Sequence, residues 1–477
     1  MAAPALEITI GDISSGSATI AYEQRNAETV YALISTREFP EPDAGTIKEE
    51  GVAGADGLFF FEGLKSGSAY FVYAVAWNGQ QHSAVHSLSF IAKDSPPEVY
   101  PWEKERSGPR IFSDITLCPG GNTSKSPYRW DEKRFAPHVS YVDKGGREHW
   151  LFEAFLGIEG EVQGRNMVMY IGTSKTHKSA DKECWQYLLD YWLGPGGCVA
   201  ALDRQIAAVK ERIGEPPTPR QFVLVAPDPI KYQVFTDPTS STTYWGSISG
   251  RTLDFSFVQD RIRAYLWYMD RAREMWDELS PKNIEFAGFY ILSEDLVATP
   301  DGWNYANKQW DIILEEVHEH LDNRNEGLYW IPYYMASGYN IWKRLGITMA
   351  WMQPNHYWDD AGVKNMDSSF GAMRRFGMGM ELEFEYSMVL EVMKRGLKGP
   401  DAEGNMTYTV EDVPMLRERF RDYMEWYRKY GLYGVNPIAL YSGSNALYQL
   451  YVSSEPEDRE IYHELCQFII NSGLREK

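Results

Sequence analysis

The sequence predicts an α/β protein, a (β/α)8 TIM barrel preceded by a small all-β domain. Two observations carry this prediction. From about residue 96 onward, strand-like and helix-like patterns alternate and eight strand candidates can be counted, which is typical of parallel βαβ units. Before that point, short strand-like segments alternate with Gly, Ser and Asn turns. We therefore expect two domains, residues 1–95 and 96–477.

The first domain has strand candidates rich in β-branched and aromatic residues, at 6–10, 17–21, 30–34 and 70–76. The segment Leu64–Tyr70 resembles the fibronectin type III pattern, in which a Leu precedes a turn and a Tyr opens the next strand. The resemblance implies a fibronectin type III-like β-sandwich in which the Tyr70 hydroxyl bonds back to the backbone. No residue here suggests chemistry, so we expect a spacer or docking module. The Pro-marked stretch 93–97 predicts a linker.

The second domain supplies the barrel elements in order. Its strand candidates are 111–117, 150–156, 222–226, 286–292, 328–334, 347–352, 376–384 and 437–441, with helices expected at 200–213, 257–279, 305–321 and 413–430. Eight strands with intervening helices over about 380 residues fit a (β/α)8 barrel with insertions. A doubly wound open sheet is the alternative, but the segment Cys118–Gly121 after the first strand is not a GxGxxG phosphate loop.

Composition excludes several classes of partner. The 477 residues include 47 basic and 67 acidic side chains, a net charge of −20, which repels nucleic acid and anionic membrane surfaces. No apolar run reaches the ~20 residues that a membrane span needs. The four cysteines are too few and too scattered for a disulfide framework or a CxxC metal site. One bridge, Cys184 to Cys198, stays open.

The start of the chain, Met1–Pro4, has no charged and apolar signal pattern. The protein is therefore either cytoplasmic or exported with its signal segment absent from this chain. The first domain favours export, to the periplasm, the cell surface or the medium, and a monomer is favoured. The aromatic share of 14% fits a large core and also a sugar-binding cleft.

The stretch Phe376–Glu385 organises the barrel prediction. Read with period two, its Met, Leu and Phe side chains face one way, while Glu381 and Glu383 face the other. An unpaired buried charge costs several kcal/mol, so this pattern is odd for an ordinary buried strand. In a parallel barrel, one face packs against helices and the other ends in a polar mouth. A strand with charges exposed at its end is the alternative.

Polar and aromatic residues fill the predicted C-terminal ends of the strands, where barrel sites lie. This profile predicts binding of hydroxyl groups and stacking on sugar faces, and the absence of a Lys or Arg cluster argues against phosphate. The candidate substrate-binding residues are Asn122, Asp228, Tyr333, Tyr334, Gln353, Asn355, His356, Tyr357, Trp358, Tyr441 and Asn445. A structural hydrogen bond is the alternative for His356, a turn for Asp228, and core packing for the aromatic residues.

Two carboxyl groups at strand ends indicate glycoside cleavage, which needs one protonated acid and one ionised nucleophile or base. We expect Glu294 to be the acid/base, with its pKa raised by its surroundings. Glu383 is the favoured nucleophile because it lies nearer the strand end, and Glu381, one layer deeper, is nearly as good. Asp295 is the rival to Glu294, and Glu385 is expected to serve the first turn of the next helix.

Other chemistries fit the sequence less well. His318 and His320 are two residues apart in a helical pattern, so they face different sides and predict no metal site. No cofactor is required. A lyase acting on uronic-acid polymers would need a basic subsite, and no Arg or Lys lies at the predicted strand ends.

Several motifs in order resemble one protein family. They are Gly288–Tyr290 with Glu294, Trp330–Tyr334, Ala336–Gly338, Trp342, Leu345–Gly346, Gln353–Asn355 and Gly377–Phe384. Across roughly residues 100 to 470, they are similar to the exported bacterial proteins of the domain of unknown function 4855 family. The resemblance implies a barrel related to glycoside hydrolases, often attached to β-sandwich modules. The sequence therefore predicts a retaining glycoside hydrolase with a carbohydrate substrate. A non-catalytic carbohydrate-binding or cell-surface interaction protein is the alternative.

Overall fold

The computed structural model describes most of the chain in two compact units, residues 1–99 and 100–477. The described ranges are 3–14, 16–36, 41–64, 69–92, 111–121, 128–168, 178–296, 310–334, 336–358, 363–397, 399–400, 406–443, 445–472 and 474. The predicted domain boundary at residue 95 and the predicted linker fall in the stretch 93–110, outside the described residues.

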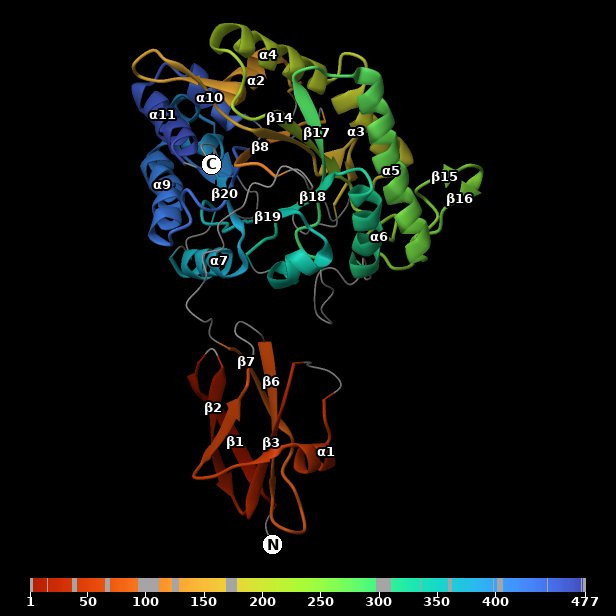
Figure 1. The fold of residues 1–477 in the computed structure, drawn as a ribbon, viewed down its shortest axis with the longest axis vertical. Coiled ribbons are helices and arrows are strands. Elements are labelled where there is room, and N and C mark those ends of the chain that lie inside the picture. Colours follow the sequence, from red (N-terminus) through yellow and green to blue (C-terminus); the bar gives the residue numbers. More distant parts are fainter. Residues whose placement is uncertain are drawn as a thin grey trace. The chain divides into compact units, whose positions relative to one another are not determined.

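The first unit consists of two antiparallel β-sheets with strand orders β1-β2-β5 and β4-β3-β6-β7 (Figure 1). Its elements are β1 (Ala5–Ile13), β2 (Ser17–Arg25), β3 (Thr29–Ser35), α1 (Ala44–Glu50), β4 (Val52–Ala53), β5 (Leu58–Glu62), β6 (Ala69–Trp77) and β7 (His86–Ile91). Buried apolar side chains from both sheets form one core, which includes Ile20, Phe59 and Val72. The four predicted strands correspond to β1, β2, β3 and β6. Tyr70 is buried, but the corner segment 65–68 lies outside the described residues.

The second unit is built on a closed barrel of eight parallel strands that follow one another in sequence order. They are β8 (Asp114–Pro119), β11 (Ala154–Ile158), β14 (Arg220–Ala226), β17 (Ile284–Ile291), β18 (Gly327–Trp330), β19 (Met349–Met352), β20 (Gly379–Glu383) and β23 (Ile438–Tyr441). Each predicted strand overlaps one of these, which confirms the α/β class and the eight-stranded parallel barrel. The second prediction began too early, because Glu148–Trp150 forms β10, which pairs antiparallel with β9 (Ser140–Val142).

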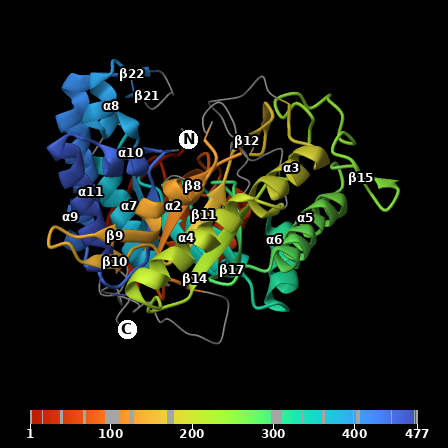
Figure 2. The ribbon, with the colours of Figure 1, turned by 90° about the horizontal axis from the view of Figure 1, so that it is seen from above.

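Helices surround the strands in Figure 1, with α4 and α5 on one side and α7 and α9 on the other. The helices are α2 (Glu132–Val139), α3 (Lys182–Leu193), α4 (Cys198–Ile213), α5 (Val258–Leu279), α6 (Trp310–Asp322), α7 (Val363–Phe376), α8 (Leu390–Lys394), α9 (Val413–Lys429), α10 (Ala446–Val452) and α11 (Pro456–Ile470), and the 3-10 turns are η2 (Tyr339–Leu345), η3 (Tyr386–Met388) and η4 (Val410–Asp412). Short pairs complete the unit: β12 (Glu161–Val162) with β13 (Arg165–Asn166), β15 (Ser247–Ile248) with β16 (Arg251–Thr252), and β21 (Gly399–Pro400) with β22 (Met406–Tyr408). Figure 2 shows the β15 region extending outward beyond α5.

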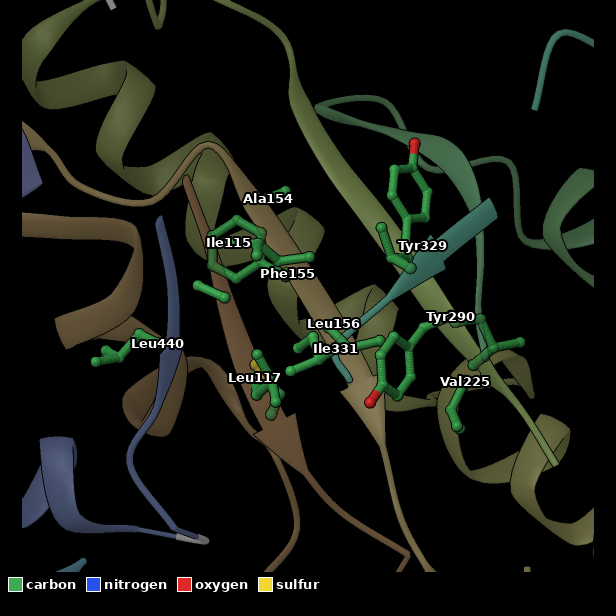
Figure 3. Packing of buried hydrophobic residues seen from close by; sticks show 14 of the residues in the cluster. Ile115, Leu117, Ala154, Phe155, Leu156, Val225, Tyr290, Tyr329, Ile331 and Leu440 are labelled. Atoms are coloured by element: carbon green, nitrogen blue, oxygen red, sulfur yellow. The ribbon is translucent and has the colours of Figure 1, made fainter. Parts of the chain in front are cut away.

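Side chains alternate between the barrel interior and the helices, as strand geometry requires. Phe155 of β11 packs edge-on against Phe135 of α2, and Phe384 packs edge-on against Phe420 of α9, so these positions face outward. Their neighbours therefore face inward. Figure 3 shows Leu156, Ile331 and Tyr290 close together within this core. The same alternation places Glu381 and Glu383 on the inner face of β20, as the sequence predicts.

A bulge in β17 changes which side chains of this strand face inward. The pairing of β14 with β17 slips by one residue, from Phe222 opposite Phe286 to Val223 opposite Gly288. Phe286 contacts Trp276 of α5 and Phe289 contacts Tyr268 of α5, so the inserted residue resets the alternation. Gly288 has φ +139°, and a Cβ there would lie 2.0 Å from the Gly327 carbonyl oxygen. Beyond the bulge, Phe289 faces α5 and its neighbour Tyr290 faces inward, in the strand that leads to Glu294.

The four cysteines are all described, free and buried, so the bridge left open between Cys184 and Cys198 is not formed. Within the described ranges, no helix combines the length and the apolar character that crossing a membrane demands.

Gly288→Ala should lower the free energy of unfolding of the barrel by about 3 kcal/mol, because φ becomes strained and the Cβ meets backbone that cannot move aside. Gly371→Ala in α7 is the matched control, since no atom lies within 4 Å of its Cβ position, and Ala in a helix gains about 0.5–1 kcal/mol. Urea titration followed by circular dichroism measures both. Equal stability of the two variants would contradict the role given to the bulge.

Candidate active site

Four carboxyl groups gather at the C-terminal end of the barrel strands. Glu294 follows β17, Asp228 follows β14, and Glu381 and Glu383 lie in β20. Glu294 is partly buried. Its pKa is raised to about 8 by burial first, and then by the charges of Glu383 and Asp228. Glu294 therefore holds its proton at neutral pH and interacts electrostatically with the carboxyl group on β20.

Glu383 is fully buried, and burial raises its pKa to about 7. Hydrogen bonds oppose this rise, because they stabilise the charged form. The Tyr423 hydroxyl donates to Oε2 at 2.8 Å, and the Asn355 backbone N–H donates to the same oxygen at 2.7 Å. The side chains of Gln353 and Trp358 also lower the pKa. Oε1 is buried and has no donor in good hydrogen-bond geometry among the described residues.

Glu381 differs from Glu383 in its electrostatic environment. Burial, followed by the charges of Glu383 and Glu294, raises the pKa of Glu381 well above its ordinary value. Glu381 therefore stays protonated where Glu383 begins to ionise. Of the two glutamates left open by the sequence, Glu383 is the one whose charged form the structure supports.

The segment after β17 is held by a side chain of β18 and by a backbone N–H of the loop that follows β18. The Trp330 indole N–H donates to the Ser293 carbonyl oxygen at 2.7 Å, and Trp330 is completely buried. The Ser337 backbone N–H donates to Asp295 Oδ1 at 3.0 Å. Asp295, the sequence-based rival to Glu294, is thus bonded to the neighbouring loop.

The turn after β19 aims a backbone donor at Glu383. Gln353 N–H donates to the Pro332 carbonyl oxygen at 2.9 Å, which anchors the start of the turn to β18. Asn355 adopts φ 58°, a left-handed conformation that Asn tolerates better than most residues. This conformation directs its N–H to Glu383 Oε2.

Tyr423 of α9 belongs to the site but is not visible in the sequence. Its hydroxyl accepts a hydrogen bond from Tyr357 N–H at 3.0 Å and donates its only proton to Glu383. It lies on the same buried helix face as Phe420 and Tyr427, a spacing that reads as an ordinary core stripe. Only the register of α9 against β20 distinguishes it.

Three predicted binding residues after β19 are held by the protein itself. His356 Nε2 lies 2.8 Å from Asp422 Oδ2 and His356 is buried. Tyr357 is fully buried, with its hydroxyl 2.8 Å from Ser387 Oγ. Trp358 is partly buried, and a hydrogen bond from its side chain lowers the pKa of Glu383. Of the three, Trp358 is placed best for a ligand, and the binding roles of His356 and Tyr357 stay predictions.

The remaining predicted residues lie at the ends of β14, β18 and β23. Tyr333 and Tyr334 are partly exposed with ring centroids 4.5 Å apart, and buried Asp228 is fixed by its N–H bond to the Met167 carbonyl oxygen. Asn445 accepts a hydrogen bond from Arg134, and Asn122 lies outside the described residues.

Glu385 is the N-cap residue of η3, so it lies where the sequence predicts, and the effect of its charge on that turn stays a prediction. Its side chain makes no capping hydrogen bond to η3, and instead accepts one from the Tyr441 hydroxyl at 3.3 Å. A Cβ at Gly443 would lie 2.0 Å from Glu385 Oε2, so the glycine makes room for this arrangement. The carboxylate of Glu385 is thereby directed toward β23.

A cavity of about 610 Å³ opens at the opposite end of the barrel, lined by residues at the starts of β17 and β18 such as Glu285 and Glu326. None of the four carboxyl groups lines it. Within the described ranges, no group of three or more His, Cys, Asp or Glu side chains could hold a metal ion.

Fold and site together define a parallel-barrel protein with a cluster of titratable carboxyl groups at the C-terminal ends of its strands. Residues 114–467 match the family described as Domain of unknown function (DUF4855), so the chain belongs to that family, as its motifs predict. No curated protein matches the chain.

Solved structures give partial similarities. A computationally redesigned β-sandwich protein is 17% identical and covers 20% of this chain and 97% of its own, with a TM-score of 0.16. The fn3 domain of the human collagen alpha-1(XX) chain is 15% identical, covering 19% and 84%, with a TM-score of 0.16. A segment of two fibronectin type III domains from chicken tenascin is 18% identical. The match covers 19% of this chain and 50% of the tenascin segment, with a TM-score of 0.16. Scores at this level do not define a fold.

Tyr423→Phe should raise the pKa of Glu383 above about 7, because the carboxylate loses a donor to its charged form. Tyr427→Phe is the matched control, since that hydroxyl is equally buried on α9 but donates to the Pro437 carbonyl oxygen at 2.9 Å. Each variant should lose about 1–2 kcal/mol of stability. NMR titration of ¹³C-labelled glutamate carboxyls, assigned with Glu383→Gln, separates them. An unchanged Glu383 titration in Tyr423→Phe would rule out the coupling.

The raised pKa of Glu294 also predicts how stability depends on pH. Between its ordinary value of 4.5 and about 8, the folded protein binds a proton that the unfolded chain releases. This contribution is present below pH 4.5 and is lost as the pH rises through 8. Wild type should therefore lose on the order of 1–3 kcal/mol more than Glu294→Gln between pH 5 and pH 8. Parallel urea-unfolding curves at the two pH values test this; identical losses would refute it.

Proposed function

We propose that this protein is a glycoside hydrolase that acts on a polysaccharide or oligosaccharide. The observation that carries the proposal is that two carboxyl groups influence each other's ionisation. Glu294 follows the fourth barrel strand and has its pKa raised to about 8, and Glu383 lies in the seventh strand and has its pKa raised to about 7. Glycosidic cleavage needs one carboxyl group that is protonated and one that is ionised, and different environments must set the two apart.

In the proposed mechanism, Glu383 attacks the anomeric carbon and forms a glycosyl ester, while Glu294 gives its proton to the departing glycosidic oxygen. Glu294, now ionised, then takes a proton from water as the water attacks the anomeric carbon and releases Glu383. Tyr423 and Asn355 hold Oε2 of Glu383, so we assign the attack to Oε1. Retention of configuration follows from the two displacements.

The finer architecture belongs to the same proposal. Sequential parallel strands with outer helices fit a TIM barrel, whose active sites lie at the C-terminal ends of the strands. In the first unit, two sheets of three and four strands fit a fibronectin type III-like module. Such a module beside a carbohydrate-active barrel favours an exported protein, and we propose a monomer.

A non-catalytic carbohydrate-binding protein is the second candidate. The observation that favours it is burial, because Glu383 has no exposed surface and Glu381 only 3%. A nucleophile must be reached by the anomeric carbon, whereas a binding protein needs contact only at the rim of the site.

Hydrolysis of a broad glycan panel should reveal a substrate, and Glu294→Gln and Glu383→Gln should each lower kcat/KM at least ~10²-fold with little change in melting temperature. Glu381→Gln should lose much less, because it replaces a carboxyl group that is already neutral. NMR of the first-formed anomer should show retention.

Full activity of Glu294→Gln on a cleaved glycan would remove Glu294 from the mechanism. A larger loss in Glu381→Gln than in Glu383→Gln would exchange the roles of these two residues. A glycan that binds and raises the melting temperature without being cut would favour the binding protein.

A further inference from the structure

We propose that the barrel mouth beside β8 and β23 carries a subsite for an anionic group of the glycan, a uronate carboxylate or a sulfate ester, centred on Arg134. The proposal rests on the proposed function in taking the ligand to be a glycan. The sequence offers no Arg or Lys at the predicted strand ends, whereas Arg134 lies in the first turn of α2, the helix that follows β8.

The guanidinium of Arg134 lies between aromatic rings. It is 4.3 Å from the ring centroid of Tyr128 and 5.2 Å from that of Tyr448, and it donates to the side-chain oxygen of Asn445. Tyr128 precedes α2, and Asn445 and Tyr448 follow β23. All of these groups therefore belong to the loops and first helical turns after two adjacent barrel strands, β8 and β23.

None of these partners carries a negative charge. Arg134 forms no ion pair with any carboxylate of the described residues, and its Nε is buried without an acceptor. Asp131, three residues earlier, uses Oδ1 to accept the Arg134 backbone N–H at 2.8 Å and so caps the helix. The charge of Asp131 acts on this half-buried guanidinium at longer range, while the groups in direct contact with it are neutral, and its planar fork matches carboxylate and sulfate oxygens.

The subsite adjoins the carboxyl cluster. Tyr128 interacts electrostatically with Tyr386, three residues beyond Glu383. Tyr441, four residues before Asn445, is influenced by Glu385 and Glu381. Tyr128 is 41% exposed, which leaves a ring face on which a sugar can stack while its anionic group reaches the guanidinium.

Charge selects the ligand class. At a net charge of −20, the protein as a whole repels anions. Arg134 therefore attracts an anionic group locally, at the barrel mouth, and does not contribute to a general attraction of anions. The raised pKa values of Glu294 and Glu381 keep these two neighbours neutral, which lessens the repulsion that an anionic glycan meets from the carboxyl cluster.

The test measures binding rather than cleavage, using the full chain with Glu294→Gln to prevent turnover. Isothermal titration calorimetry compares oligogalacturonate, a sulfated oligosaccharide and a neutral oligosaccharide of the same length. We expect one of the anionic ligands to bind at least ~10-fold more tightly than the neutral one, with an affinity that falls as salt rises. Whether the uronate or the sulfated ligand binds identifies the group.

Arg134→Met should remove the anionic preference and leave neutral binding within about twofold. Arg129→Met is the matched control. Arg129 lies in the loop just before α2, but it donates to the Gly196 carbonyl oxygen and lies 5.9 Å from the centroid of the Tyr191 ring. Asn445→Asp keeps the side-chain size and gives Arg134 an internal carboxylate. It should also remove the preference, which guards against misfolding of Arg134→Met.

Several outcomes overturn the subsite: no binding of either anionic ligand at millimolar concentration, equal binding of anionic and neutral ligands, or an unchanged preference in Arg134→Met and Asn445→Asp. If one of these outcomes is found while wild type cuts neutral glycans, the proposed hydrolase activity stands and the anionic subsite does not. If Arg134-dependent binding is found and wild type cuts nothing, the subsite stands and the hydrolase does not.

Discussion

The structure depends on one electrostatic constraint: the carboxyl groups at the barrel mouth are too close and too deeply buried to ionise together. Burial disfavours each charge, and each charge raises the pKa of its neighbours, as Glu294, Glu381 and Glu383 show. Among these three glutamates, the hydrogen-bond donors within the described residues go to Glu383. Tyr423 and Asn355 converge on Glu383, so these three glutamates divide into one whose charged form is stabilised by donors and two whose pKa values are raised without such donors.

Several parts of the surrounding fold position these carboxyl groups and their donors. The bulge at Gly288 sets the register of β17, the strand that leads to Glu294, and Trp330 binds the Ser293 carbonyl oxygen just before Glu294. On the other side, α9 brings Tyr423 to β20. Buried carboxyl groups lower stability near neutral pH, and a fold retains such a cost most readily where it serves function. The carboxyl cluster is therefore better explained as a functional site than as packing.

The sequence predicts those features that period and order encode. Alternation alone places Glu381 and Glu383 inside, and strand counting finds all eight barrel strands. Features that depend on contacts between distant segments are not visible. Tyr423 reads as helix core, Arg134 lies 15 residues beyond the end of β8, and the bulge in β17 depends on Gly288 meeting Gly327 on another strand. The hydrogen bond between Glu385 and Tyr441 is likewise invisible, because Tyr441 comes from a strand 56 residues away.

The carboxyl cluster and the proposed anionic subsite also reinforce each other. An anion held beside the cluster would act as a further negative charge, and negative charge raises the pKa of a neighbouring carboxyl group. Binding an anionic glycan would then keep Glu294 protonated to a higher pH, in the form that a general acid needs. By linkage, protonation of Glu294 would tighten binding of the same anion by an equal factor. Substrate charge and acid protonation would thus be coupled through a short stretch of the barrel mouth, without any conformational change.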